Sequence, residues 1–175
     1  METNFIFVCL LPNYMDDVAS LVANKLDMFT VSVEELMQQE YGDEISLSAM
    51  LNSKEGKAKL EQCETRVAKK VKNFENSIVC LPIDSMLDEK NVESILGSGT
   101  IVYLQISPTC FEKRCKESGD YVDEKLNEVT FSEKDKYWVN RSELVINCSK
   151  YKESKAGAKL SKLCTKFLAK QKNNE

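Results

Sequence analysis

The side chains most able to do covalent or metal chemistry in this chain are its seven cysteines, because it contains no histidine. Without imidazole, Ser-His-Asp and Cys-His nucleophiles are excluded, and so are metal sites that depend on histidine. The cysteines are odd in number, run from Cys9 to Cys164 and form no Cys-x-x-Cys pair. That spacing favours reduced thiols in the core over a disulfide framework or a zinc site, and it predicts no metal centre.

A group of polar side chains directly follows the first apolar run, Phe5–Leu11, which has the length and composition of a buried strand. Asn13 is a good N-cap for a helix predicted from about Tyr14 to Leu26. Asp16 and Asp17 would then occupy the first helical turn. Two carboxylates there satisfy the positive end of the helix dipole and would repel an anionic ligand.

The elements that must position these side chains alternate along the rest of the chain. Further strands are predicted at 29–31, 77–81, 100–104 and 144–147, and helices at 33–39, 47–51, 52–71, 86–96, 109–116, 131–140 and 155–170. Residues 117–130 lack periodicity and predict a lid-like excursion. Strands that alternate with helices imply right-handed crossovers, and so an α/β fold: a three-layer, five-stranded parallel sheet with helices on both faces. With 175 residues, 42% of them hydrophobic, one domain over 1–175 is expected.

Charge is unevenly distributed, although the net charge is only −4. Residues 1–53 hold one lysine and no arginine, whereas the helix at 155–170 is rich in lysine. That helix could contact an anionic partner or simply be solvated, and the two ends of the chain could attract each other in a homo-oligomer. The balance does not favour nucleic acid. Glu2 does not fit a signal peptide and the run 5–11 is too short to span a membrane, so a cytoplasmic protein is expected.

Five features of the chain taken together indicate a family resemblance. They are the buried first strand, the turn into a helix, the later Asp27-Met28, the long helix before the third strand and the aromatic-containing helix before the last strand. In these features the chain resembles shikimate kinase. The resemblance covers almost the whole chain and implies a P-loop kinase architecture. In that family the first strand leads into the phosphate-binding pattern G-x-x-x-x-G-K-[ST]. Here the aligned residues Cys9–Asp16 read CLLPNYMD.

None of that pattern is kept in this degenerate P-loop, which comprises Pro12, Asn13, Tyr14, Met15, Asp16 and Asp17. Tyr14 brings a side chain where backbone access is needed, and Pro12 cannot donate an N–H. Met15 has no charge where a lysine would neutralise phosphate. The resemblance therefore implies a kinase-like chain without a nucleotide or metal cofactor.

The substrate side also departs from the family. The family's acidic pair falls on Ser32 and Glu34, which leaves one carboxylate, and its helical arginine falls on Glu61, a reversed charge. Its glycine triplet falls on residues 83–85, and its lid arginine falls near Tyr121.

Three residues persist in part. Arg114 resembles the adenine-side arginine, Lys134 replaces a substrate arginine and Trp138 replaces a tyrosine. Lysine offers a point charge where arginine would bind bidentately. Each residue also has an ordinary structural interpretation: a surface arginine for Arg114, a groove or core aromatic for Trp138 and a solvated helix residue for Glu34.

Three functional hypotheses follow. The leading one is an inactive shikimate kinase-like domain, a pseudokinase that binds a protein or small ligand. The second is an active small-molecule kinase with an unorthodox phosphate site, built from Arg114 and the C-terminal lysines. The third is an α/β interaction protein unrelated to kinases.

Overall fold

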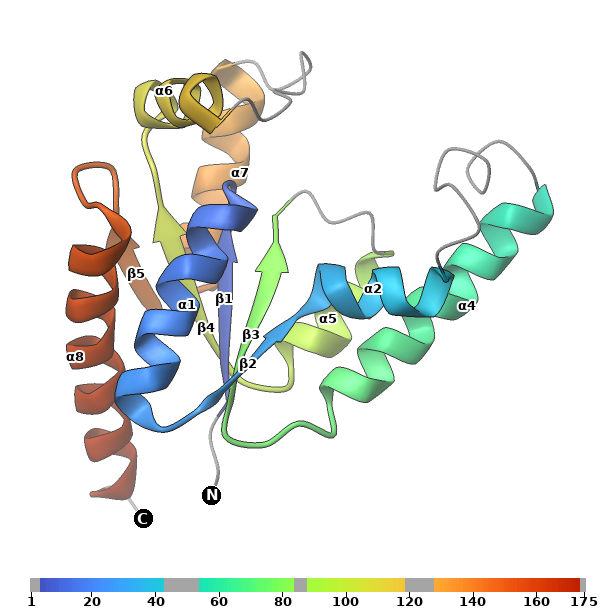
Figure 1. Ribbon diagram of the computed structural model, residues 1–175, viewed down its shortest axis with the longest axis horizontal. Helices are drawn as coiled ribbons and strands as arrows, with labels where there is room; N and C mark the ends of the chain where they lie inside the picture. The colour runs from blue at the N-terminus through green and yellow to red at the C-terminus, as the bar shows by residue number, and fades with distance from the viewer. Residues whose placement is uncertain (1–3, 43–53, 84–87, 119–127, 174–175) are drawn as a thin grey trace.

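The computed structural model describes residues 4–42, 54–83, 88–118 and 128–173. The elements follow in the order β1 (Phe5–Cys9), α1 (Pro12–Leu26), β2 (Phe29–Ser32), α2 (Val33–Tyr41), α4 (Lys54–Val71), β3 (Ser77–Pro82), α5 (Glu89–Leu96), β4 (Thr100–Gln105), α6 (Pro108–Ser118), α7 (Glu128–Arg141), β5 (Leu144–Asn147) and α8 (Glu153–Lys172). Figure 1 shows them along the chain, with α1 crossing in front of the sheet and α8 beside it.

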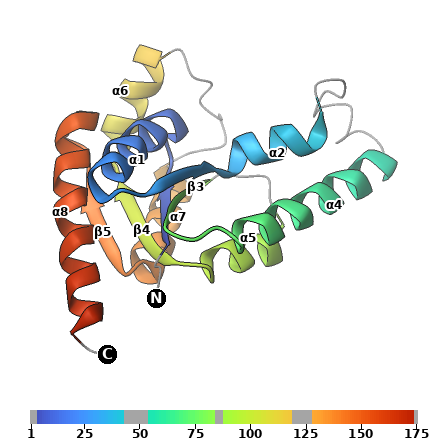
Figure 2. The same ribbon diagram turned by 60° about the horizontal axis from the view of Figure 1, so that its bottom comes forward.

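The five strands form one parallel sheet in the order β2-β3-β1-β4-β5. Both faces of the sheet are covered, and Figure 2 shows α1 on one side of the strands and α5 and α7 on the other. The prediction of a three-layer α/β fold with five parallel strands is confirmed.

The central strand β1 shows why helices must cover both faces of this sheet. All five of its residues are buried, and they alternate between two apolar clusters. Phe5 and Phe7 belong to the cluster that contains α1 and α8, whereas Ile6 and Val8 belong to the cluster that contains α4 and α5. A strand buried on both faces reads as an unbroken apolar run, which is why the sequence shows no alternation there.

The start of α1 differs from the sequence prediction. The helix begins at Pro12, and Leu11, which makes no side-chain cap, takes the N-cap position that was assigned to Asn13. Proline suits the first helical position, because its fixed φ is helical and an N–H there would lack a partner within the helix. As a result no acidic residue lies in the first turn. The prediction that placed Asp16 and Asp17 there is wrong, and both belong to the second turn.

The segment predicted as an excursion at 117–130 is shorter than expected. α6 continues to Ser118 and α7 begins at Glu128, so both ends of the segment are helical. The central residues 119–127, like the short helix predicted at 47–51, lie outside the described residues. The C-terminal helix is longer than predicted, from Glu153 to Lys172.

Candidate binding site at the carboxyl edge of the sheet

A groove lies beside the N-terminal end of α1, at the edge of the sheet where β1, β4 and β5 end. In parallel α/β sheets this edge is the usual place for ligands. The groove has a volume of about 590 Å³. It is lined by Leu11, Asn13, Tyr14, Asp17, Cys110, Lys113, Arg114, Glu117, Ser149, Lys150, Tyr151, Lys152 and Glu153.

Tyr14 fills the space next to the beginning of α1. Its side chain is buried, and its hydroxyl donates a hydrogen bond to the Tyr151 carbonyl oxygen at 3.0 Å. The Arg114 guanidinium lies over the Tyr14 ring, 3.9 Å from the ring centroid. The N–H of Met15 already donates to the Leu11 carbonyl oxygen at 3.0 Å, since the helix has begun. A phenol ring and a helical turn therefore occupy the space at the carboxyl end of β1.

Arg114 is held on the wall of this groove by main-chain and side-chain contacts. Its Nη2 donates to the Tyr151 carbonyl oxygen at 2.7 Å, and its Nη1 lies 4.0 Å from a carboxylate oxygen of Glu153. The structure thus brings together the predicted adenine-side arginine and the residues after the first strand. Their contact with each other gives Arg114 a stacking role that the sequence did not indicate.

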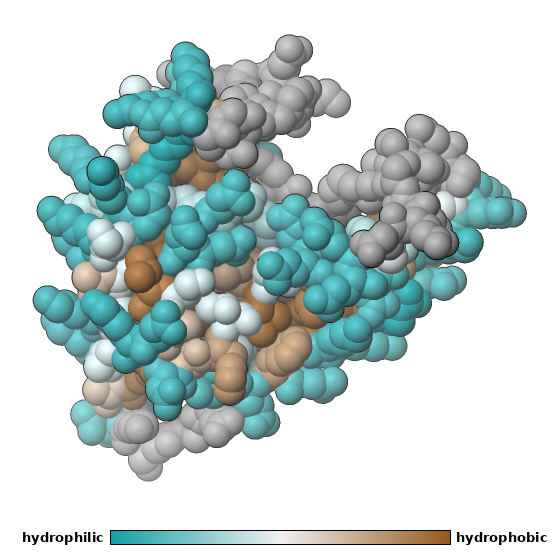
Figure 3. All heavy atoms as spheres, in the orientation of Figure 1, coloured by the Kyte–Doolittle hydropathy of each residue, from teal (hydrophilic) through white to brown (hydrophobic). Residues whose placement is uncertain are grey.

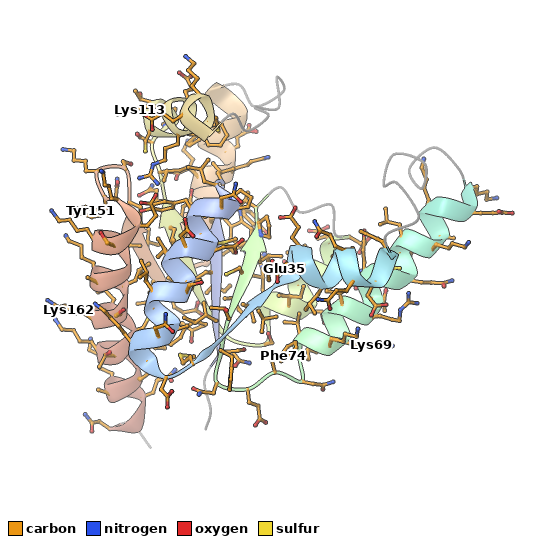
Figure 4. The ribbon with its side chains drawn as sticks, viewed as in Figure 1. Glu35, Lys69, Phe74, Lys113, Tyr151 and Lys162 are labelled. Atoms are coloured by element: carbon orange, nitrogen blue, oxygen red, sulfur yellow. The ribbon has the colours of Figure 1, made fainter. Side chains whose placement is uncertain are left out.

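The rim of the groove carries charges of both signs. Lys113, Lys150 and Lys152 are exposed there, together with Asp17 and Glu117. Figure 4 shows Lys113 on α6 and Tyr151 next to the start of α8, on the same side of the molecule. Sequence analysis did not single out Lys113 or Tyr151. Their positions in the sequence could have indicated them, because each residue follows the carboxyl end of a predicted strand, where ligands usually bind.

Met15 and Asp16 point away from this groove. Met15 is fully buried in the cluster that contains α1 and α8. Asp16 is half-buried, and burial raises the pKa of its carboxyl, with a hydrogen bond from the Cys80 thiol opposing the shift and Glu34 and Glu35 adding to it. Met15 is thus a core residue, and Asp16 is a carboxyl group with other acidic side chains nearby.

The cysteines behave as packing residues. Six of the seven are buried and Cys110 is partly exposed, and none of the seven forms a disulfide bond. Burial raises the pKa of Cys9 to about 12 and that of Cys148 to about 11. Thiols with such values hold little thiolate at neutral pH, so they are poor nucleophiles.

A second hollow, of about 430 Å³, lies between the end of β3 and α7. Its lining residues are Leu81, Pro82, Ile83, Glu89, Val92, Glu133, Lys134, Tyr137 and Trp138. It therefore joins Lys134 and Trp138, which were both predicted as substrate-side residues. Trp138 is largely buried, with its ring edge-on to Tyr137 at a centroid distance of 5.2 Å.

Glu34 does not join this hollow. It is exposed in the first turn of α2, and Glu61 is exposed on α4. Asp84, Ser85 and Tyr121, the remaining positions compared with the family, lie outside the described residues.

Asp135 lies on α7 next to Lys134, and the sequence analysis did not identify it. It accepts hydrogen bonds from the Tyr103 hydroxyl at 2.9 Å and from Gln105 Nε2 at 3.0 Å. These contacts tie α7, and with it Lys134 and Trp138, to the carboxyl end of β4. No sequence pattern marks such a bond, because its partners are 30 or more residues apart.

Among the described residues, no three carboxylate or thiol side chains are grouped so that they could hold a metal ion. Within the same part of the chain, none of the helices combines the length and apolar character required to cross a bilayer.

The strand order, the helix that leaves the central strand and the groove at its carboxyl end define the class of P-loop kinase folds. Solved shikimate kinases share this architecture. The enzyme from Aquifex aeolicus superposes with a TM-score of 0.69 at 18% identity over 98% of both chains. That from Bacteroides thetaiotaomicron gives 0.70 at 13% identity over 94% of this chain and 99% of the other.

The sequence comparison is more specific. The family model for shikimate kinase matches residues 17–172, and the chain belongs to the shikimate kinase family. A shikimate kinase from Caldicellulosiruptor saccharolyticus is 29% identical over 100 residues, which are 57% of this chain and 56% of that protein. The match to the family begins just after the segment Cys9–Asp16. Family membership excludes the hypothesis of an α/β protein unrelated to kinases.

Proposed function

We propose that this chain is a catalytically inactive shikimate kinase-like domain that has lost ATP and Mg²⁺ binding and acts as a binding or interaction module. The observation that carries the proposal is the buried Tyr14 ring beneath Arg114, at the position where the family's pattern needs glycine and open backbone amides.

Three physical requirements of phosphate binding are unmet there. The amide of Met15 is used within α1, and Pro12 has no N–H to offer. The Met15 side chain is apolar and fully buried, so no ammonium group reaches the groove from that position. Asp17 lines the groove and adds negative charge, and at about 4 Å with an effective dielectric near 20 a carboxylate–phosphate pair would cost roughly 4 kcal/mol.

What the chain retains is better suited to binding than to phosphoryl transfer. The hollow beside Trp138 offers an aromatic wall and the ammonium of Lys134, and the groove beside Tyr14 offers Arg114 and Tyr151. Concave sites with a few convergent polar groups are typical of small-ligand and peptide binding. We therefore propose that the ligand is a small molecule other than a nucleotide, or a segment of a protein.

Titration with ATP and Mg²⁺ by isothermal calorimetry tests the proposal. We expect heats equal to those of dilution up to millimolar nucleotide, while the Aquifex aeolicus shikimate kinase, measured in parallel, gives a saturable isotherm. A one-to-one isotherm with micromolar affinity for this chain would refute the loss of nucleotide binding.

One observation favours a second function, an active kinase with an unorthodox phosphate site. The groove beside α1 carries four cationic side chains, those of Lys113, Arg114, Lys150 and Lys152. A coupled assay with shikimate and ATP separates the two functions. Turnover that depends on enzyme concentration supports the kinase, and a rate equal to the blank eliminates its shikimate version.

A further inference from the structure

Five lysines form a stripe along one side of α8. Lys155, Lys159, Lys162, Lys166 and Lys170, here called the lysine flank, are spaced three or four residues apart, and all are exposed. At 100° per residue they fall within an arc of about 80°, and at 1.5 Å per residue they span about 22 Å. Figure 3 shows hydrophilic side chains over the outer side of α8, at the left.

The lysine flank has no carboxylate partner in the regions that the structure describes. No ion pair within 4.0 Å involves any of the five lysines there. Instead, two of them gather around Tyr151. Lys159 Nζ donates to the Tyr151 hydroxyl at 2.6 Å, and the Lys155 and Lys159 ammonium groups lie 5.4 and 4.2 Å from its ring centroid. Like charges so close repel one another, so an added anion would relieve this repulsion.

A groove of about 400 Å³ runs between the lysine flank and β5. Its lining residues are Val145, Ile146, Asn147, Tyr151, Lys159, Lys162, Leu163 and Lys166. Figure 4 shows Tyr151 next to the start of α8 and Lys162 further along the helix, so the groove follows the helix. Val145 contributes an apolar contact, since 40% of its surface is exposed.

β5 ends the sheet in this direction, so one of its edges has no neighbouring strand among the described elements. The Cys148 N–H donates to the Gln105 carbonyl oxygen at 2.7 Å, and Gln105 is in register with Asn147. In a parallel ladder alternate residues direct their backbone groups to the same neighbour. Val145 and Asn147 therefore direct theirs to the open edge, beside the groove.

We propose that this groove binds an acidic, extended segment of a partner protein, which adds as a strand to β5 and places its carboxylates on the lysine flank. Strand addition supplies affinity through main-chain bonds and specificity through alternate side chains. The spacing fits, because alternate residues of a strand are about 6.7 Å apart and Lys162 and Lys166 are about 6 Å apart along α8. The inference does not depend on whether nucleotide binding has been lost.

The probe is a fluorescent eight-residue peptide of alternating Glu and Thr, titrated by fluorescence anisotropy at low salt. Its affinity for the unmodified chain should fall steeply as salt rises. Replacement of Lys159, Lys162 and Lys166 by Glu should weaken binding at least tenfold. The matched control replaces Lys57, Lys69 and Lys72 by Glu, an equal charge change on and after α4, and should stay within twofold.

The backbone part of the proposal has its own tests. Val145→Pro removes an outward N–H while the bonds to β4 remain, and should weaken binding at least tenfold, whereas Val145→Thr should stay within threefold. Circular dichroism checks the fold of each variant. If Val145→Pro does not fold, a probe methylated on alternate amide nitrogens tests the same bonds with the unmodified chain and should bind at least tenfold more weakly.

Several outcomes overturn the proposal. Equal weakening by both lysine triples would mean that only net charge matters. Full binding of the methylated probe would exclude strand addition. Tighter binding of RNA or of vesicles containing phosphatidylserine, lost with the same lysines, would assign the lysine flank to those ligands. An absence of probe binding at millimolar concentration would leave the lysines as protection of an exposed sheet edge.

Discussion

Replacing Tyr14 by Ala tests whether the ring is packed as described. Truncation of a buried aromatic side chain to Ala usually costs about 3–5 kcal/mol, and stacking beneath a guanidinium adds about 0.5–2 kcal/mol. The lost hydroxyl bond costs little, since Arg114 still donates to the Tyr151 carbonyl. Tyr14 borders the groove, so water can fill part of the space it leaves. We therefore expect Tyr14→Ala to lower the free energy of unfolding by about 3–4 kcal/mol and Tyr14→Phe by about 0.5–1 kcal/mol.

Urea unfolding measures these differences. The single tryptophan, Trp138, is buried on the other face of the sheet and reports global unfolding by its fluorescence. Phe29→Ala is a matched control, because that ring is 72% exposed, and it should change stability by no more than about 0.5 kcal/mol. A loss below 1 kcal/mol for Tyr14→Ala, at an unchanged m-value, would refute the packing of Tyr14 beneath Arg114.

Three further predictions concern other residues of the site and the sheet. Burial raises the pKa of the Asp16 carboxyl above its ordinary value of 3.8. The stabilising contribution of the protonated carboxyl is therefore present below pH 3.8 and is lost as the pH rises through the folded-state pKa. Asp16→Asn should thus raise the melting temperature by about 1–2 °C at pH 7, and a thermal scan at pH 3 should show no gain. Asp135→Ala should cost about 1–3 kcal/mol in urea unfolding, because it leaves the buried Tyr103 hydroxyl without its acceptor; an unchanged midpoint would contradict that bond. Gly99→Ala should cost about 2 kcal/mol or more in the same assay, since the added Cβ would lie 2.5 Å from the Asn4 carbonyl oxygen, and wild-type stability would show that the turn can shift freely.

The sheet was predictable because its strands are short apolar runs bounded by turn residues. Leu144–Asn147 was predicted at its observed bounds, and Phe29–Ser32 differs from its prediction by one residue. The start of α1 was not predictable from capping preferences. Asn13 is a favourable N-cap, yet Pro12 is equally suited to the first helical position, and the packing of Tyr14 into the core cluster favours the earlier start.

The candidate site was predictable only where its residues share one element. Lys134 and Trp138 were predicted from the family resemblance, and because they are four residues apart on α7, helical spacing places both on one hollow. The contact between Tyr14 and Arg114 joins residues 100 positions apart, and no periodicity in a single sequence encodes such a pair. The same holds for the groove between α8 and β5, because the lysine spacing was visible but the neighbouring sheet edge was not.

A crystal soaked with a non-hydrolysable ATP analogue and Mg²⁺ tests the central claim most directly. The account predicts no phosphate density against residues 12–17, with the Tyr14 ring still beneath the Arg114 guanidinium. Density for two or more phosphates against those residues, with Tyr14 turned out of the groove, would contradict it.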